Sequence, residues 1–200
     1  MTLTRMVSLT ALMLSVAGCA TIETPTRASS LDVAGLTPAV TVAQRSYALQ
    51  DVQVIMPASL RISEGAGYYP NADVVWRGDP IGDRAQQITA MFETAGDRVS
   101  AGLTGDVPVI AVVTLLRFHG LTERTRYSVG GVYSIEFTLE IRNAQTGAVI
   151  ETARVVKHDL PGPGGLAAVA LEQAGQTEKV RVTDHLTYVL QLELTGATSS

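Results

Sequence analysis

Hydrophobic and polar residues alternate most regularly over residues 133–141, where the sequence reads YSIEFTLEI. The apolar side chains occupy every second position, which predicts a strand with one buried face. Residues 107–118, VPVIAVVTLLRF, are apolar at both alternating positions and predict a central strand buried on both faces. The turn NAQTG, with Gly147 available for a positive φ, leads into a partner strand over residues 148–160. These segments predict three antiparallel strands in succession.

Two further segments have the spacing of amphipathic helices. In the first, apolar residues recur at steps of three and four over residues 81–103, with Asp79 placed to cap the helix and Pro80 in its first turn. A shorter helix is expected over residues 166–174. The last helix is expected over residues 177–194, where one face carries four aliphatic side chains: Val182, Leu186, Val189 and Leu190.

The order of these elements predicts the fold class. A first strand is expected within residues 51–57 and a brief buried one over 72–76, both ahead of the first long helix. Helices segregated on one face of antiparallel strands belong to the α+β class. The sequence therefore predicts a single α+β domain over residues 47–198, in which an antiparallel β-meander is packed on one face by two helices.

The N-terminal segment has the charge pattern of a secretory signal. Arg5 is followed by residues 6–17, which carry no charge and are too few to span a bilayer. The segment ends in VAGC, which resembles the lipobox of bacterial lipoproteins. The resemblance implies that residues 1–18 are a signal peptide cleaved between Gly18 and Cys19. It also implies that the Cys19 thiol carries a covalent diacylglyceryl lipid and that the new amine is acylated.

Cys19 is the only cysteine of the chain, so its role has alternatives. It could be a free thiol left after an ordinary signal peptide, or a catalytic nucleophile. A nucleophile would need a group that lowers the thiol pKa, and no histidine precedes His119. A lipidated Cys19 leaves no disulfide and no thiolate metal site. Because the histidines at 119, 158 and 185 show no metal-site spacing, no metal and no cofactor beyond the lipid are expected.

Residues 19–46 are rich in Thr, Ser, Ala and Pro and predict a lipidated tether. Its root-mean-square reach of roughly 25–30 Å would let the domain stand off the membrane. The residue after the lipidated cysteine is Ala20, whereas an aspartate there would favour retention in the inner membrane. We therefore expect the protein in the cell envelope, lipid-anchored and facing the periplasm, on the outer membrane rather than the inner one.

The charge of the chain bears on its partners. Removal of residues 1–18 takes away one arginine and no acid, so the formal net charge changes from −4 to −5. The only lysines are Lys157 and Lys179, and no basic run is present. This balance argues against a nucleic-acid partner.

The densest polar cluster is RFHGLTERTRYSVGG, residues 117–131, between two of the predicted strands. It is the first choice for a contact surface that binds an anionic headgroup or an envelope protein partner. The alternative is structural: Arg117 and Glu123 pair across the mouth of a hairpin. This interpretation is favoured because charged residues in exposed loops are usually only solvated. The candidate contact residues are Arg117, His119, Glu123, Arg124, Arg126 and Tyr127.

An enzymatic role remains the competing hypothesis. No nucleophile motif or phosphate-binding loop occurs. An envelope hydrolase or carbohydrate-active enzyme would have to use acids or histidines near Trp76 or His119, and paired carboxylates could hydrolyse a glycoside. The acids near Trp76 are Asp73, Asp79 and Asp83.

The stretches NADVVWRGDPIGDR and RFHGLTERTRYSVGGVYSIEFTL resemble a family of small bacterial lipoproteins that carry a domain of unknown function. The resemblance covers residues 47–195 and implies no activity. The layout of lipobox, tether and small α+β domain is similar to that of auxiliary lipoproteins of ABC-type lipid transport and of lipoproteins that assist outer-membrane assembly. The expected role is a non-enzymatic binding, assembly or transport accessory anchored in the membrane.

The anchor can be tested directly. Cys19→Ser removes the acceptor of the lipid, so we expect the protein to leave the membrane fraction or to stay unprocessed. Cell fractionation and the apparent mass on a gel measure this. A variant that remains membrane-bound at the mature size would contradict the lipid anchor.

Overall fold

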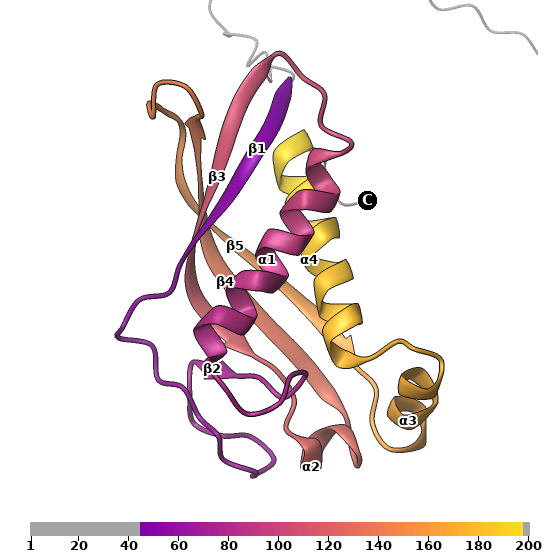
Figure 1. Ribbon diagram of the computed structural model, residues 1–200. Coiled ribbons are helices and arrows are strands. Elements are labelled where there is room, and N and C mark those ends of the chain that lie inside the picture. The colour runs from indigo at the N-terminus through magenta and orange to yellow at the C-terminus, as the bar shows by residue number, and fades with distance from the viewer. Residues whose placement is uncertain (1–44, 198–200) are drawn as a thin grey trace, which may run out of the picture. The chain divides into compact units, whose positions relative to one another are not determined.

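The computed structural model describes residues 45–197 (Figure 1). The predicted signal peptide, Cys19 and nearly all of the tether lie outside these residues. The elements follow in this order: β1 Tyr47–Ile55, β2 Val74–Val75, α1 Arg84–Ser100, β3 Val107–His119, α2 Glu123–Arg126, β4 Gly131–Asn143, β5 Val149–Gly162, α3 Leu166–Gln173 and α4 Glu178–Thr195.

The strands form one sheet of order β1-β3-β4-β5, and the short β2 also pairs with β3. Strands β3, β4 and β5 run antiparallel in succession, as the alternating pattern predicts. Figure 1 shows α1 and α4 side by side along one face of this sheet. The α+β prediction is therefore confirmed. No helix within residues 45–197 has the length and hydrophobicity needed to cross a bilayer.

The first strand departs from a simple meander. β1 runs parallel to β3, with Tyr47 opposite Val107. Helix α1 lies between these strands in the chain, and a helical crossover brings the following strand back in the same direction. The antiparallel meander thus comprises β3–β5, and β1 extends it into a mixed sheet.

Helix α1 begins later than the sequence suggests. Asp83 caps it by accepting a hydrogen bond from the Gln86 amide, so the expected start at Asp79 and Pro80 is wrong. The Asp79 carboxylate accepts instead from Trp76 Nε1 at 2.8 Å and from Lys179 Nζ at 2.7 Å. The Asp79 carboxylate therefore connects Trp76 to Lys179 of α4 and does not cap α1.

The core lies between the sheet and the two long helices. The predicted inward faces of β4 and α4 are buried there, as is the middle of the predicted face of α1. Ile81, expected at the start of that face, lies ahead of α1 and is exposed. Phe92 of α1 packs edge-on against Phe137 of β4, with ring centroids 5.4 Å apart. Helix α1 approaches β1 so closely that a Cβ at Gly96 would lie 2.3 Å from Val52 Cγ2. Glycine is therefore required sterically at this crossing.

We expect Gly96→Ala to lower the free energy of unfolding by about 1–3 kcal/mol, because the overlap with Val52 outweighs the gain of about 1 kcal/mol in helix propensity. Urea denaturation measures this. Gly102→Ala is the control, since a Cβ there meets nothing closer than 3.7 Å. Adding Val52→Ala to Gly96→Ala should recover part of the loss. A Gly96→Ala variant as stable as the wild type would contradict this packing.

Candidate functional site

The predicted contact segment, residues 117–131, comprises the end of β3, the short helix α2 and the turn into β4. Thr122 caps α2, and its hydroxyl donates to the Gly67 carbonyl at 2.8 Å. The Thr125 hydroxyl donates to the Tyr68 carbonyl at 2.6 Å. These two threonines attach the distant loop at residues 67–68 to α2.

The aromatic pair Tyr68 and Tyr69 gathers three of the predicted contact residues. Arg117 Nη2 donates to the Tyr69 hydroxyl at 2.6 Å. The His119 ring stacks on Tyr69 with centroids 4.3 Å apart, and its Nε2 lies 3.0 Å from the Pro70 carbonyl oxygen. The Arg124 guanidinium lies 4.7 Å from the centroid of the Tyr68 ring. These three residues and the two tyrosines, which are far apart in the chain, lie together, and we call this cluster the rim.

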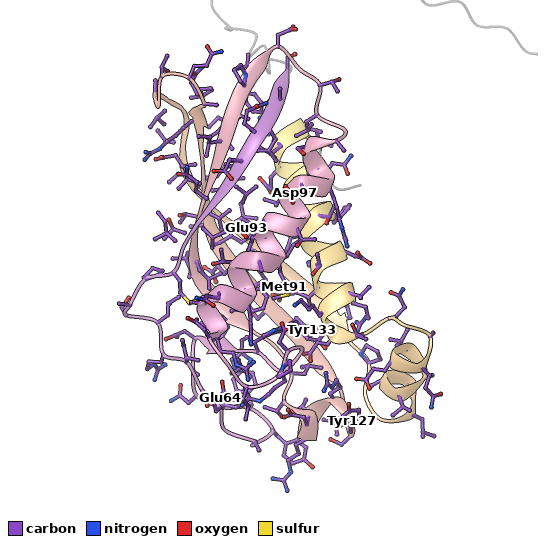
Figure 2. The ribbon with its side chains drawn as sticks, in the orientation of Figure 1. Glu64, Met91, Glu93, Asp97, Tyr127 and Tyr133 are labelled. Carbon is purple, nitrogen blue, oxygen red and sulfur yellow. The ribbon has the colours of Figure 1, made fainter. Side chains whose placement is uncertain are left out.

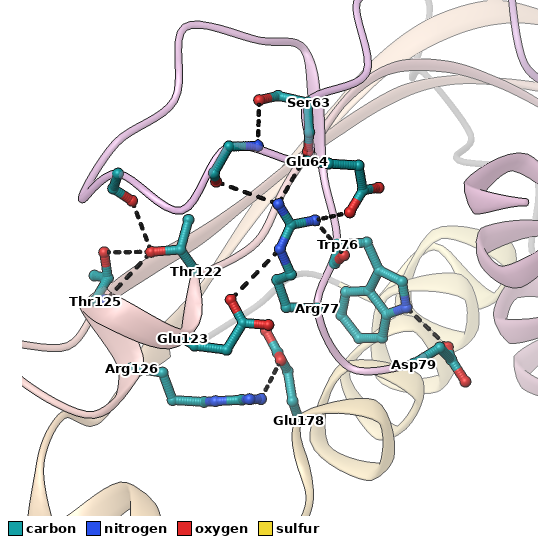
Figure 3. A network of polar contacts seen from close by, with 12 residues as sticks. Ser63, Glu64, Trp76, Arg77, Asp79, Thr122, Glu123, Thr125, Arg126 and Glu178 are labelled. Atoms are coloured by element: carbon teal, nitrogen blue, oxygen red, sulfur yellow. Dashed lines mark hydrogen bonds and ion pairs between the residues drawn. The ribbon is translucent and has the colours of Figure 1, made fainter. Parts of the chain in front are cut away.

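The expected pairing of Arg117 with Glu123 does not form. Glu123 lies instead 3.5 Å from the Nε of Arg77, whose side chain is only 5% exposed (Figure 3). Arg77 also pairs with Glu64 at 2.7 Å and donates to the Gly65 carbonyl. Glu123 pairs with Arg77 because β2 pairs with the end of β3, which places Arg77 next to α2.

No motif or spacing in the sequence indicates that Arg77 and Glu64 belong to this cluster. Glu64 also accepts two hydrogen bonds from Arg84, a side chain that is nearly fully buried. The hydrogen bond from Arg84 lowers the pKa of the Glu64 carboxyl, although partial burial opposes it. Figure 2 shows Glu64 at the same end of the domain as Tyr127 and Tyr133.

A second buried ion pair attaches the segment to the helices. Arg126 of α2 donates from Nη1 to Glu178 in the first turn of α4. Tyr127 donates to Glu172 of α3 at 3.1 Å. Burial raises the pKa of the Glu178 carboxyl from 4.5 to about 7, with the charge of Arg126 opposing the shift. Loss of water around the carboxylate therefore outweighs the attraction of its partner.

A groove of about 430 Å³ opens beside this network. It lies on the sheet face away from α1 and α4, because Val132 and Ser134 alternate with the buried Tyr133 and Ile135. Its lining is mainly apolar and includes one acid: Tyr68, Tyr69, His119, Leu121, Thr125, Val129, Val132, Ser134 and Asp159, with three glycines. Tyr69 and Val129 are more than two-thirds exposed, so the groove presents apolar surface to solvent.

The residues proposed for catalysis near Trp76 do not form one site. Trp76 is fully buried and cannot stack on a sugar. Asp73 accepts from Arg61, while Asp83 caps α1. Together with the pairing of Asp79 to Lys179, this gives each acid its own structural partner.

The histidines are separated as well. His158 and His185 lie between β5 and α4, with ring centroids 6.1 Å apart, and neither lines the groove. Within residues 45–197, no three His, Cys, Asp or Glu side chains are placed to hold a metal ion.

Comparison with known proteins places the domain in a family. Residues 47–200 match DUF6778, which is described as a family of unknown function. The chain belongs to the DUF6778 family. The expectation of a domain of unknown function is thereby confirmed. No curated protein matches the chain.

Solved structures similar to this DUF6778 chain include two of stated origin. One is protein XCC0632 from Xanthomonas campestris, of the DUF330 family, with 17% identity, coverage of 78% of this chain and 90% of that chain, and a TM-score of 0.38. The other is a candidate lipoprotein from Caulobacter crescentus CB15, with 15% identity, coverage of 58% and 84%, and a TM-score of 0.29. These distant likenesses assign no role to the chain.

The buried carboxyl of Glu178 predicts a pH dependence of stability. Its pKa is raised in the folded protein, so its favourable contribution is present below about pH 4.5 and is lost as the pH rises through about 7. Relative to Glu178→Gln, the wild type should therefore lose about 1–3 kcal/mol of unfolding free energy between pH 5 and pH 8.

Urea denaturation of both proteins at the two pH values measures this difference. Asp184→Asn, which removes an exposed carboxylate from the same helix, serves as the control and should show a smaller change. A difference between the wild type and Glu178→Gln that does not change with pH would contradict the raised pKa.

Proposed function

We propose that this protein is a lipid-anchored accessory of the bacterial envelope that binds a phospholipid in the groove beside α2. The observation that carries the proposal is an apolar groove bordered by two arginines on exposed tyrosines. The lipobox and tether would keep this groove near a membrane, the source of such a ligand. The role is non-enzymatic binding, in support of lipid transport or envelope assembly.

The chemistry of the groove fits the two parts of a phospholipid. Val129, Val132 and Leu121 offer apolar surface for an acyl chain, whose transfer from water is favourable by about 0.8 kcal/mol per CH₂ group. Arg117 and Arg124, held on the two tyrosines, place positive charge at the rim for a phosphate. A volume of about 430 Å³ suits part of one lipid.

The walls of the groove are held before any ligand arrives. The hydroxyls of Thr122 and Thr125 fix the loop that carries Tyr68, and His119 packs against Tyr69. A site that is already ordered loses less conformational entropy on binding. This arrangement supports binding without a large rearrangement of the loop.

The location follows from the N-terminus. We propose that the mature protein starts at Cys19, faces the periplasm and resides on the outer membrane, because Ala20 follows the lipidated residue. A tether of residues 19–46 would let the groove reach lipids that are leaving or entering the bilayer.

A hydrolase is the second candidate, and one observation favours it. His119, Ser134 and Asp159 lie opposite one another on β3, β4 and β5, and all three line the groove. A Ser–His–Asp relay needs the imidazole between the other two groups, whereas here Ser134 occupies the middle strand. Esterase activity of the wild type that is abolished by Ser134→Ala would favour the enzyme.

Lipid binding is tested with a chain that begins at residue 19 and carries Cys19→Ser, so that the anchor does not contribute. Val132→Asp places a carboxylate in the groove, and we expect at least a tenfold loss of affinity for a phosphatidylglycerol with a fluorescent acyl chain. Val149→Asp is the matched control, because Val149 is equally exposed but lies in the β4–β5 hairpin. Fluorescence titration measures both, and equal affinities in the two variants would overturn the proposal.

A further inference from the structure

Strand β5 has a long edge that pairs with no other strand within residues 45–197. It spans Val149–Gly162 and lies at the end of the sheet, so only β4 contacts it as a strand. Residues 154–162 pair with β4 without any shift of register, and the irregularities lie nearer the hairpin. A regular edge of this length is a template for another strand unless it is protected.

The charged residues on this edge are placed so that they could pair with those of a second copy of the same strand. Val155, Lys157 and Asp159 are exposed on the sheet face away from the helices, and they alternate with the buried Val156. If two copies of β5 align antiparallel with His158 opposite His158, Lys157 of each copy lies opposite Asp159 of the other. Opposite charges placed directly across an antiparallel pair stabilise it.

The neighbouring registers lack this match. A shift of the two-fold axis to residue 157 places Lys157 opposite itself, and a shift to residue 159 places Asp159 opposite itself. Like charges directly opposite each other destabilise a strand pair. The register centred on His158 spans the regular segment 154–162, in which Pro161 has no N–H to donate, and it ends before α3 begins.

Helix α4 lies beside this edge and places an exposed aromatic side chain near it. Arg181 donates to the Pro161 carbonyl of β5 at 2.7 Å, and His185 lies against His158. The next residue along this stripe of α4 is Tyr188, whose side chain is half exposed. Figure 1 shows α4 beside α1 along the sheet, with β5 behind it. Tyr188 therefore stands next to the edge that a second copy would occupy.

We propose that two copies of this chain associate through antiparallel pairing of their β5 strands. Their two-fold axis passes through His158, and Lys157 of each copy pairs with Asp159 of the other. The sheet continues from one copy into the other, and Tyr188 approaches its counterpart across the axis. The β5 edge and the groove mouth at the tyrosines are different surfaces that meet at Asp159, which lines the groove. Lys157 is not among the lining residues, so Lys157→Asp tests the pairing separately from lipid binding.

Charge reversal tests the pairing in solution, with the chain that begins at residue 19 and carries Cys19→Ser. Sedimentation velocity over a range of concentrations should show a dimer for the wild type. Lys157→Asp and Asp159→Lys should each raise the dissociation constant at least tenfold, and the double variant should restore the dimer. Glu93→Lys on α1 changes the net charge as Asp159→Lys does and should leave the dimer intact (Figure 2).

A cysteine crosslink tests the register in the full-length chain. His158→Cys brings two thiols together across the axis, within the Cα separation of about 4.4–6.8 Å that a disulfide needs. We expect a covalent dimer on a non-reducing gel after oxidation, whereas Lys157→Cys should give little. A monomer at every concentration, or a double reversal that does not restore the dimer, would overturn the proposal. Lys157 and Pro161 would then serve to keep the edge unpaired.

Discussion

The buried ion pair between Arg126 and Glu178 connects the short helix α2 to the start of α4. Arg126 belongs to α2, which follows the central strand, and Glu178 begins the last helix. Neither charge could remain buried alone, because an unpartnered ion in a protein interior is strongly destabilising. The position of α2 relative to α4 is therefore constrained, and with it the loop that α2 holds. The groove depends on that chain of contacts.

Two surfaces follow from the way the sheet is covered. Within residues 45–197, both long helices pack on one face, and neither covers the opposite face or the outer edge of β5. The groove forms on the open face, where the loop of Tyr68 and Tyr69 folds over the ends of β3 and β4. The edge of β5 remains on the side of α4. The two surfaces share Asp159, which lines the groove and belongs to the edge strand β5.

Much of the fold could be predicted from periodicity. The alternation over residues 133–141 corresponds to β4, and the apolar run over 107–118 corresponds to the central β3. The start of α1 could not, because Asp79 satisfies the local rules of a cap and is taken by Trp76 and Lys179. Lys179 is 100 residues away, so no local pattern could indicate the competition.

The density of polar side chains over residues 117–131 predicts a contact surface there. The structure gathers Arg117, His119 and Arg124 around two tyrosines, and binding at this surface stays a prediction. No pattern in the sequence indicates Glu64 and Arg77 as partners of this cluster, because a single charged residue in a loop has the same local sequence whether it is solvated or paired. The lipid anchor at Cys19 lies outside the described residues and stays a prediction.

The sequence by itself determined the strands β3, β4 and β5, most of α1 and α4, and the buried face of β4 and α4, because periodicity records burial. Only the tertiary structure decided that β1 runs parallel to β3, that Glu123 pairs with Arg77, and that Glu178 is buried against Arg126. The physical reason is that charge pairing and strand direction depend on distances across the fold. The sequence pattern indicates whether a residue is buried or exposed, whereas tertiary packing determines which residue it contacts.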